Sequence, residues 1–164
     1  GQRANGIQPG RALTLTTLYL DADGCPVKDE AYRVAERYGL HTYVVANAWL
    51  RVPESATIER VTVGDRLDEA DDWIAEHARP GDIVVTSDIP LADRAIKAGA
   101  RVVTPDGRVL DARTIGDVLA TRNLLTDLRE AGTIRGGGRP FGKAERSRFL
   151  EAMDRVVNAI RRGR

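Results

Sequence analysis

Short apolar, β-branched segments alternate with segments of helical periodicity along most of this chain. The apolar segments occupy residues 15–21, 41–46, 58–63, 83–87 and 101–104. Apolar residues at helical spacing predict helices over residues 26–38, 67–78, 89–98, 114–130 and 144–162. Strands that alternate with helices of this length pair in parallel through right-handed crossovers. We therefore predict an α/β fold with a mostly parallel sheet and helices on both faces.

A chain of 164 residues has the length of a single domain. We expect residues 1–14 to form a flexible N-terminal extension and residues 15–131 to form the α/β domain. Residues 132–164 are expected to form a Gly-rich basic loop and a C-terminal helix that packs on that domain. The sequence contains no internal repeat, and nothing in it indicates a second domain.

The composition favours a soluble globular protein, with 42% hydrophobic and 30% charged residues. No apolar run of about 18 residues is present, so we expect no membrane segment and no membrane partner. The first residues lack the apolar stretch of a secretion signal. Cys25 is the single cysteine, which fits a reducing compartment, and we expect a cytoplasmic protein.

Charge is distributed unevenly along the chain. Residues 21–132 contain 14 basic and 21 acidic residues, whereas residues 133–164 contain 9 basic and 3 acidic ones. Basic candidates for contacts to a nucleic-acid backbone are Arg135, Arg139, Lys143 and Arg146. The alternative is a connector to a docking helix with a solvated, Arg-rich face.

Acidic residues recur where predicted strands end and the following helices begin. The candidates are Asp21, Asp23, Asp68, Asp71, Asp88 and Asp93. Ligands of open parallel sheets bind at the carboxyl ends of the strands, and clustered carboxylates favour hard cations. Any single acid among them is equally explained as a helix cap. Their recurrence favours a site for Mg²⁺ or Mn²⁺ that activates water for phosphodiester hydrolysis.

Four blocks carry a family resemblance: LDADGCPVK, GDRLDEAD, GDIVVTSDIPLAD and GGGRPFGKAERSRF. They resemble the signature blocks of the uncharacterised bacterial YaiI/YqxD family, which is assigned to the PIN-like nuclease superfamily. The resemblance implies a PIN-like domain, a metal-dependent nuclease that acts on nucleic acid, with RNA favoured, and a homodimer. It matches Asp21, Asp71 and Asp88 to the catalytic acids of that superfamily. Asp93 is a looser match, and Asp23 belongs to the family block.

Two other functions remain open. One is a nucleic-acid-binding or regulatory module that lacks turnover. The other is a phosphatase similar to the haloacid dehalogenases, in which Asp21 attacks phosphorus and Asp23 is the acid/base, with Ser87 and Lys97 in supporting roles.

Three polar or aromatic residues near the predicted site have two interpretations each. Asn47 is a candidate ligand of nucleic acid or an ordinary turn residue. Trp49 is a platform for a base or a packed side chain. Cys25 is a nucleophile at a helix N-terminus or a packed thiol.

Overall fold

The computed structural model describes residues 16–64, 66, 68–121 and 141–163. Within them, six strands form one sheet in the order β3-β2-β1-β4-β5-β6. Their bounds are β1 Thr17–Asp21, β2 His41–Ala46, β3 Ile58–Thr62, β4 Ile83–Val85, β5 Arg101–Val103 and β6 Val109–Leu110. Neighbouring strands are parallel in the part of the sheet that runs β3-β2-β1-β4-β5, and β6 is antiparallel to β5. This arrangement confirms the predicted α/β class with a mostly parallel sheet.

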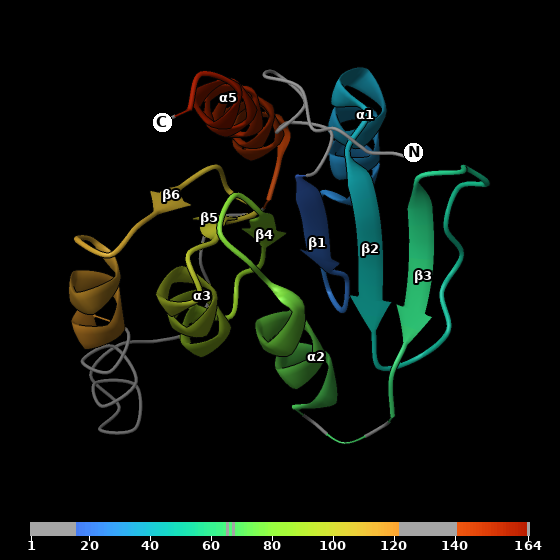
Figure 1. Ribbon diagram of the computed structural model, residues 1–164, viewed down its shortest axis with the longest axis horizontal. Helices are drawn as coiled ribbons and strands as arrows, with labels where there is room; N and C mark the ends of the chain where they lie inside the picture. Colours follow the sequence, from blue (N-terminus) through green and yellow to red (C-terminus); the bar gives the residue numbers. More distant parts are fainter. Residues whose placement is uncertain (1–15, 65, 67, 122–140, 164) are drawn as a thin grey trace, which may run out of the picture.

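Helices cover both faces of the sheet (Figure 1). They are α1 Lys28–Tyr38, α2 Glu69–His77, α3 Ile89–Lys97 and α5 Lys143–Arg161, and residues 115–121 are also helical. α1 and α5 lie together on one face, while α2 and α3 lie on the other (Figure 1). α1 ends at Gly39, which adopts the left-handed conformation with φ 67° that favours glycine.

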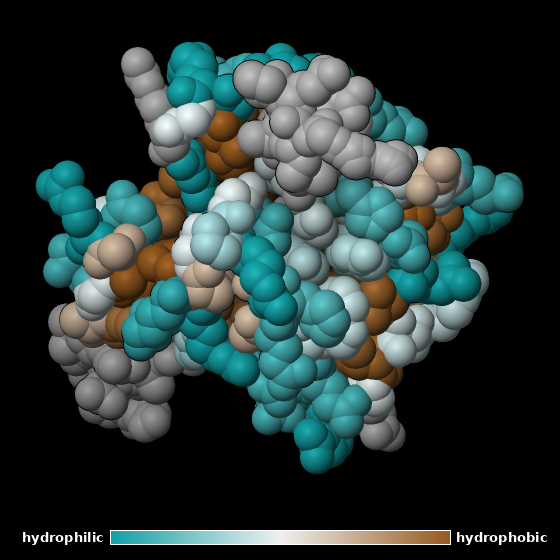
Figure 2. All heavy atoms as spheres, in the orientation of Figure 1, coloured by the Kyte–Doolittle hydropathy of each residue, from teal (hydrophilic) through white to brown (hydrophobic). Residues whose placement is uncertain are grey.

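The sheet separates two apolar clusters. In the first, Phe149 and Met153 of α5 pack with Val34 of α1 against the sheet. In the second, Ile74 of α2 and Leu91 of α3 pack on the opposite face. The central strand β4 is fully buried because it is covered on both faces. Hydrophilic side chains cover most of the surface seen in Figure 2, with apolar ones visible in patches between them.

The structure adds one strand that the sequence pattern did not predict. β6 is two residues long, and a turn at residues 105–107 returns the chain to pair Val103 with Val109. A segment this short carries no periodic signal. None of the described helices is both long enough and apolar enough to cross a membrane. The expected N-terminal extension and residues 122–140 lie outside the described residues.

Candidate functional site

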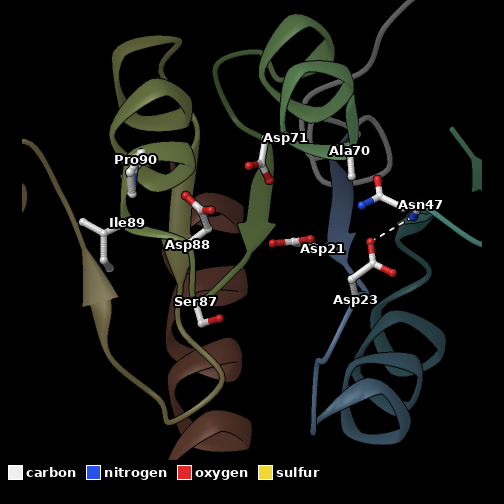
Figure 3. A pocket seen from close by; sticks show the side chains of 9 residues that line it. All are labelled: Asp21, Asp23, Asn47, Ala70, Asp71, Ser87, Asp88, Ile89 and Pro90. Carbon is white, nitrogen blue, oxygen red and sulfur yellow. Dashed lines mark hydrogen bonds between the residues drawn. The ribbon is translucent and has the colours of Figure 1, made fainter. Parts of the chain in front are cut away.

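A cavity of about 410 Å³ opens at the carboxyl edge of the sheet (Figure 3). Its lining residues are Asp21, Asp23, Asn47, Ala70, Asp71, Ser87, Asp88, Ile89 and Pro90. The chain leaves β1 toward β2 and β3 on one side and returns to β4 on the other. The cavity therefore lies at the point where the strand order reverses, which is where open α/β sheets bind ligands.

Three carboxylates point toward one another across the middle of this cavity (Figure 3). Asp21 is the last residue of β1, Asp71 lies in the first turn of α2, and Asp88 precedes α3. These are the three acids that the family resemblance matches to catalytic acids. Among the described residues that line the cavity there is no lysine, arginine or histidine, so this lining carries negative charge.

Thr86, which the sequence analysis did not single out, connects two of these acids. Its hydroxyl donates a 2.7 Å hydrogen bond to Asp21 Oδ2 and accepts one of 2.9 Å from the backbone N–H of Asp88. Thr86 is buried, with 1% of its surface exposed. The hydroxyl therefore fixes the orientation of the Asp21 carboxylate relative to the start of α3.

Asp88 is also the N-cap of α3. Its Oδ1 accepts a 2.8 Å hydrogen bond from the backbone N–H of Leu91. The capping interpretation of this acid is therefore correct. It does not compete with a ligand role, because the carboxylate still faces the cavity (Figure 3).

Mutual repulsion and burial shift the protonation of the carboxylates. Burial, together with the nearby negative charges of Asp88 and Asp21, raises the pKa of Asp71 to about 6. Burial also raises the pKa of Asp21, and the bond from Thr86 opposes this rise. A cation in the cavity would relieve the repulsion that favours the protonated forms.

Asp23 and Asn47 form the other side of the cavity. Asp23 Oδ2 accepts a 2.9 Å hydrogen bond from the backbone N–H of Asn47, which joins the turn after β1 to the end of β2 (Figure 3). The side-chain oxygen Oδ1 of Asn47 is buried and has no hydrogen-bond partner. A buried oxygen without a partner is uncommon and marks a place for a water or ligand.

The structure places two of the candidate metal ligands away from the cavity lining. Asp68 is an exposed residue before α2, and its side chain makes no capping hydrogen bond. Asp93 accepts a 2.9 Å hydrogen bond from Lys97 on the same helix. Lys97 therefore contacts Asp93 and is not among the residues that line the cavity, where the phosphatase interpretation gives it a supporting role. Ser87 does line the cavity.

Of the four basic candidates for contacts to nucleic acid, the structure describes Lys143 and Arg146. Arg135 and Arg139 lie outside the described residues. Lys143 is exposed at the start of α5. Arg146 donates a 2.6 Å hydrogen bond to the carbonyl oxygen of Pro26 and lies 3.3 Å from a carboxylate oxygen of Glu30. Arg146 thereby joins α5 to the turn between β1 and α1.

Cys25 is buried in that same turn, with 7% of its surface exposed. Burial raises the pKa of its thiol, which disfavours the reactive thiolate. The structure therefore supports the packed thiol over the nucleophile.

No group of three or more His, Cys, Asp or Glu side chains in the described part of the chain is arranged so that it could hold a metal ion. The acids of the cavity converge from three elements without forming a closed set of protein ligands.

Together, fold and cavity define an α/β protein with an acid-lined cavity at the switch point of its sheet. A model of the family described as "Uncharacterized BCR, YaiI/YqxD family" matches residues 19–159. The chain therefore belongs to the YaiI/YqxD family.

The sequence similarity to curated relatives extends over nearly the whole chain. The chain is 55% identical over 151 residues to a UPF0178 protein of Bradyrhizobium diazoefficiens, covering 92% of this chain and 90% of that protein. It is 53% identical over 148 residues to a UPF0178 protein of a Caulobacter species, covering 90% and 98% respectively. No solved structure matches the chain.

Proposed function

We propose that this protein is a PIN-like phosphodiesterase that depends on Mg²⁺ or Mn²⁺ and acts on nucleic acid, with RNA as the favoured substrate. The observation that carries the proposal is the convergence of Asp21, Asp71 and Asp88 on one cavity at the switch point of the sheet (Figure 3). Three acids from separate elements in one negative cavity are costly for the fold unless a ligand of opposite charge compensates them.

The residues present fit a hydrated divalent cation. Each polar side chain among the described lining residues offers an oxygen atom, the ligand type that Mg²⁺ and Mn²⁺ prefer. Mg²⁺ keeps several of its waters and binds through one or two carboxylates, so it does not need a closed set of protein ligands. The buried Asn47 Oδ1, which has no partner, supplies an acceptor for one such water.

The chain would hold and orient the reacting groups as follows. Asp21 and Asp88 would bind the cation, and Thr86 keeps the Asp21 carboxylate in place. Asp71 faces them from α2 and would orient water on the opposite side of the cavity. A bound divalent cation supplies Lewis acidity toward the phosphoryl oxygens and lowers the pKa of a bound water. Hydrolysis adds a water molecule to phosphorus and breaks the bond from phosphorus to the sugar oxygen, which takes up a proton released from that water.

Cleavage of end-labelled single-stranded RNA tests this function. The full chain is incubated with Mn²⁺ or with EDTA, beside Asp88→Asn and Asp72→Asn. Asn is as good a helix N-cap as Asp, so the first variant keeps α3 intact. Asp72 is the matched control because it lies next to Asp71 but pairs with Arg94 at 2.8 Å outside the cavity lining.

We expect cleavage by the wild type and by Asp72→Asn with Mn²⁺ only, and none by Asp88→Asn. Intact RNA in every lane, or equal cleavage by Asp88→Asn, would overturn the proposal. RNA that is bound but uncut by the wild type would point instead to a binding module.

A further inference from the structure

Trp49 is the most exposed large apolar side chain among the described residues. Its exposed fraction is 65%, and the other such residue, Val109, reaches 37%. Only 5% of the chain is aromatic, and Tyr19, Tyr43 and Trp73 pack against one another on the sheet. The structure thus contradicts the interpretation of Trp49 as a packed side chain.

Arg60 covers part of the Trp49 ring. Its guanidinium carbon lies 4.8 Å from the ring centroid, a cation–π contact. Arg60 belongs to β3, the edge strand of the sheet, and is itself exposed. A planar guanidinium on one face of the indole restrains the orientation of the ring. The exposure of Trp49 leaves much of the ring open to a second flat group.

This pair is continuous with the rim of the acid-lined cavity. Asn47 lines the cavity and precedes Trp49 by two residues, so their Cα atoms lie within about 7 Å of each other. The bond from Asn47 N–H to Asp23 fixes the start of this loop. After Trp49, Leu50 and Val52 pack against the core and hold the continuation of the loop.

The charge of the cavity explains why a substrate needs such a surface. Carboxylates repel the phosphates of a nucleic acid, so binding free energy must come from contacts beside the cavity. An exposed indole stacks on any base, and an adjacent arginine attracts the backbone. A paired base offers no free face at its position in the duplex, so the surface fits an unpaired strand.

We propose that Trp49 and Arg60 form a stacking platform for an unpaired base of a single-stranded nucleic acid. The phosphodiester next to that base would enter the cavity. This inference rests on the proposed function, because it names how the substrate of that same site is held. Arg60 shares its sheet face with Ile58, which packs in the core beneath α1 and α5. The nucleic-acid strand would therefore reach the platform by crossing the end of the β-sheet.

Fluorescence anisotropy of a labelled single-stranded RNA tests the platform. Binding is measured in EDTA, so that turnover does not contribute. Trp49→Ala and Trp49→Phe are compared with the wild type, and Val109→Ala is the matched control at the opposite edge of the sheet. An abasic strand of the same length separates stacking from contacts to the backbone.

We expect Trp49→Ala to weaken binding to the base-bearing strand roughly fivefold or more, the size of one lost base–aromatic stack. Trp49→Phe retains part of the affinity, and Val109→Ala retains all of it. The abasic strand binds the wild type and Trp49→Ala equally. Unchanged binding by Trp49→Ala, an equal loss with the abasic strand, or no binding by the wild type would overturn the platform. A dimer that dissociates in Trp49→Ala would assign the surface to self-association and overturn it as well.

The two proposals fail in different ways. Cleavage of RNA without any effect of Trp49 would leave the phosphodiesterase standing and remove the platform. Binding that depends on Trp49 without Mn²⁺-dependent cleavage would do the reverse.

Discussion

The hydroxyl of Thr86 donates a 2.7 Å hydrogen bond to Asp21 Oδ2, across 65 residues of sequence. The same hydroxyl accepts the backbone N–H of Asp88. A single buried side chain thus relates the carboxylate at the end of β1 to the backbone at the start of α3.

Thr86→Val should destabilise the fold and weaken cation binding. Val has the same shape but leaves Asp21 Oδ2 and the Asp88 N–H without this partner, at a cost of about 1–3 kcal/mol. Thr86→Ser keeps the hydroxyl and should retain most of both properties. Urea unfolding gives the stability, and the rise in Tm with Mn²⁺ gives the binding.

Thr42→Val is the control for this prediction. Thr42 is equally buried, and its hydroxyl donates to the carbonyl oxygen of Leu40, away from the cavity. It should lose stability and keep its response to Mn²⁺. If Thr86→Val responds to Mn²⁺ as fully as Thr42→Val does, Thr86 has no role in the site.

Asp71→Asn should stabilise the protein at neutral pH when no cation is added. The folded pKa of Asp71 is about 6, against an ordinary value of 3.8, so between these values the folded chain binds a proton that the unfolded chain has lost. Stability therefore falls as pH rises through this window. The gain in Asp71→Asn should be on the order of 1 kcal/mol at pH about 7, because solvent screens the site, and should vanish near pH about 4.

Thermal unfolding in EDTA across this pH range measures the effect. Asp72→Asn is the control, since it breaks the exposed ion pair with Arg94 and should bring no gain. A stability difference for Asp71→Asn that does not vary with pH would contradict the assigned repulsion.

The parallel part of the fold was predictable because its signal is local and repeated. β4 is a continuous apolar segment, β5 is apolar after Arg101, and α1 ends at Tyr38, the last residue of the helix predicted over residues 26–38. β6 was not predictable, because two residues have no periodicity and form a strand only through pairing with β5. The role of Thr86 also escaped prediction, because its partner is distant in sequence.

The acids at strand ends were predictable as a group, whereas their directions were not. Asp88 and Asp93 are five residues apart, which turns them about 140° from each other around a helix axis. Asp88 therefore faces the cavity while Asp93 pairs with Lys97. The exposure of Trp49 likewise depends on its loop and on Arg60, which the sequence pattern does not relate.

Gly107→Ala should be clearly more destabilising than Gly81→Ala. Both glycines have positive φ, 92° and 89°, so both variants carry backbone strain of about 1–2 kcal/mol. At Gly107 the new Cβ would also lie 2.5 Å from the backbone carbon of Arg148, whereas at Gly81 it meets nothing within 4 Å. Urea unfolding of the two variants measures the difference. Equal losses would mean that α5 does not pack closely on this turn.

Arg146→Ala should cost about 1–3 kcal/mol of stability, because it removes a partner of Glu30, whose side chain is 9% exposed. Arg37→Ala is the control, since it breaks an exposed pair with Asp154 and should cost less than about 1 kcal/mol. Unfolding and RNA binding are measured on the same samples. Weaker RNA binding at unchanged stability would show that Arg146 contacts nucleic acid in preference to Glu30 and Pro26.

The rise in Tm that Mn²⁺ induces measures most directly whether Asp21 and Asp88 belong to one cation site. At a Mn²⁺ concentration about a hundredfold above Kd, the wild type should gain roughly 5–10 °C. Asp21→Asn and Asp88→Asn should each lose this gain, while Asp93→Asn, whose side chain pairs with Lys97, should keep it. Gains in both cavity variants as large as in the wild type would contradict a cation site between these carboxylates.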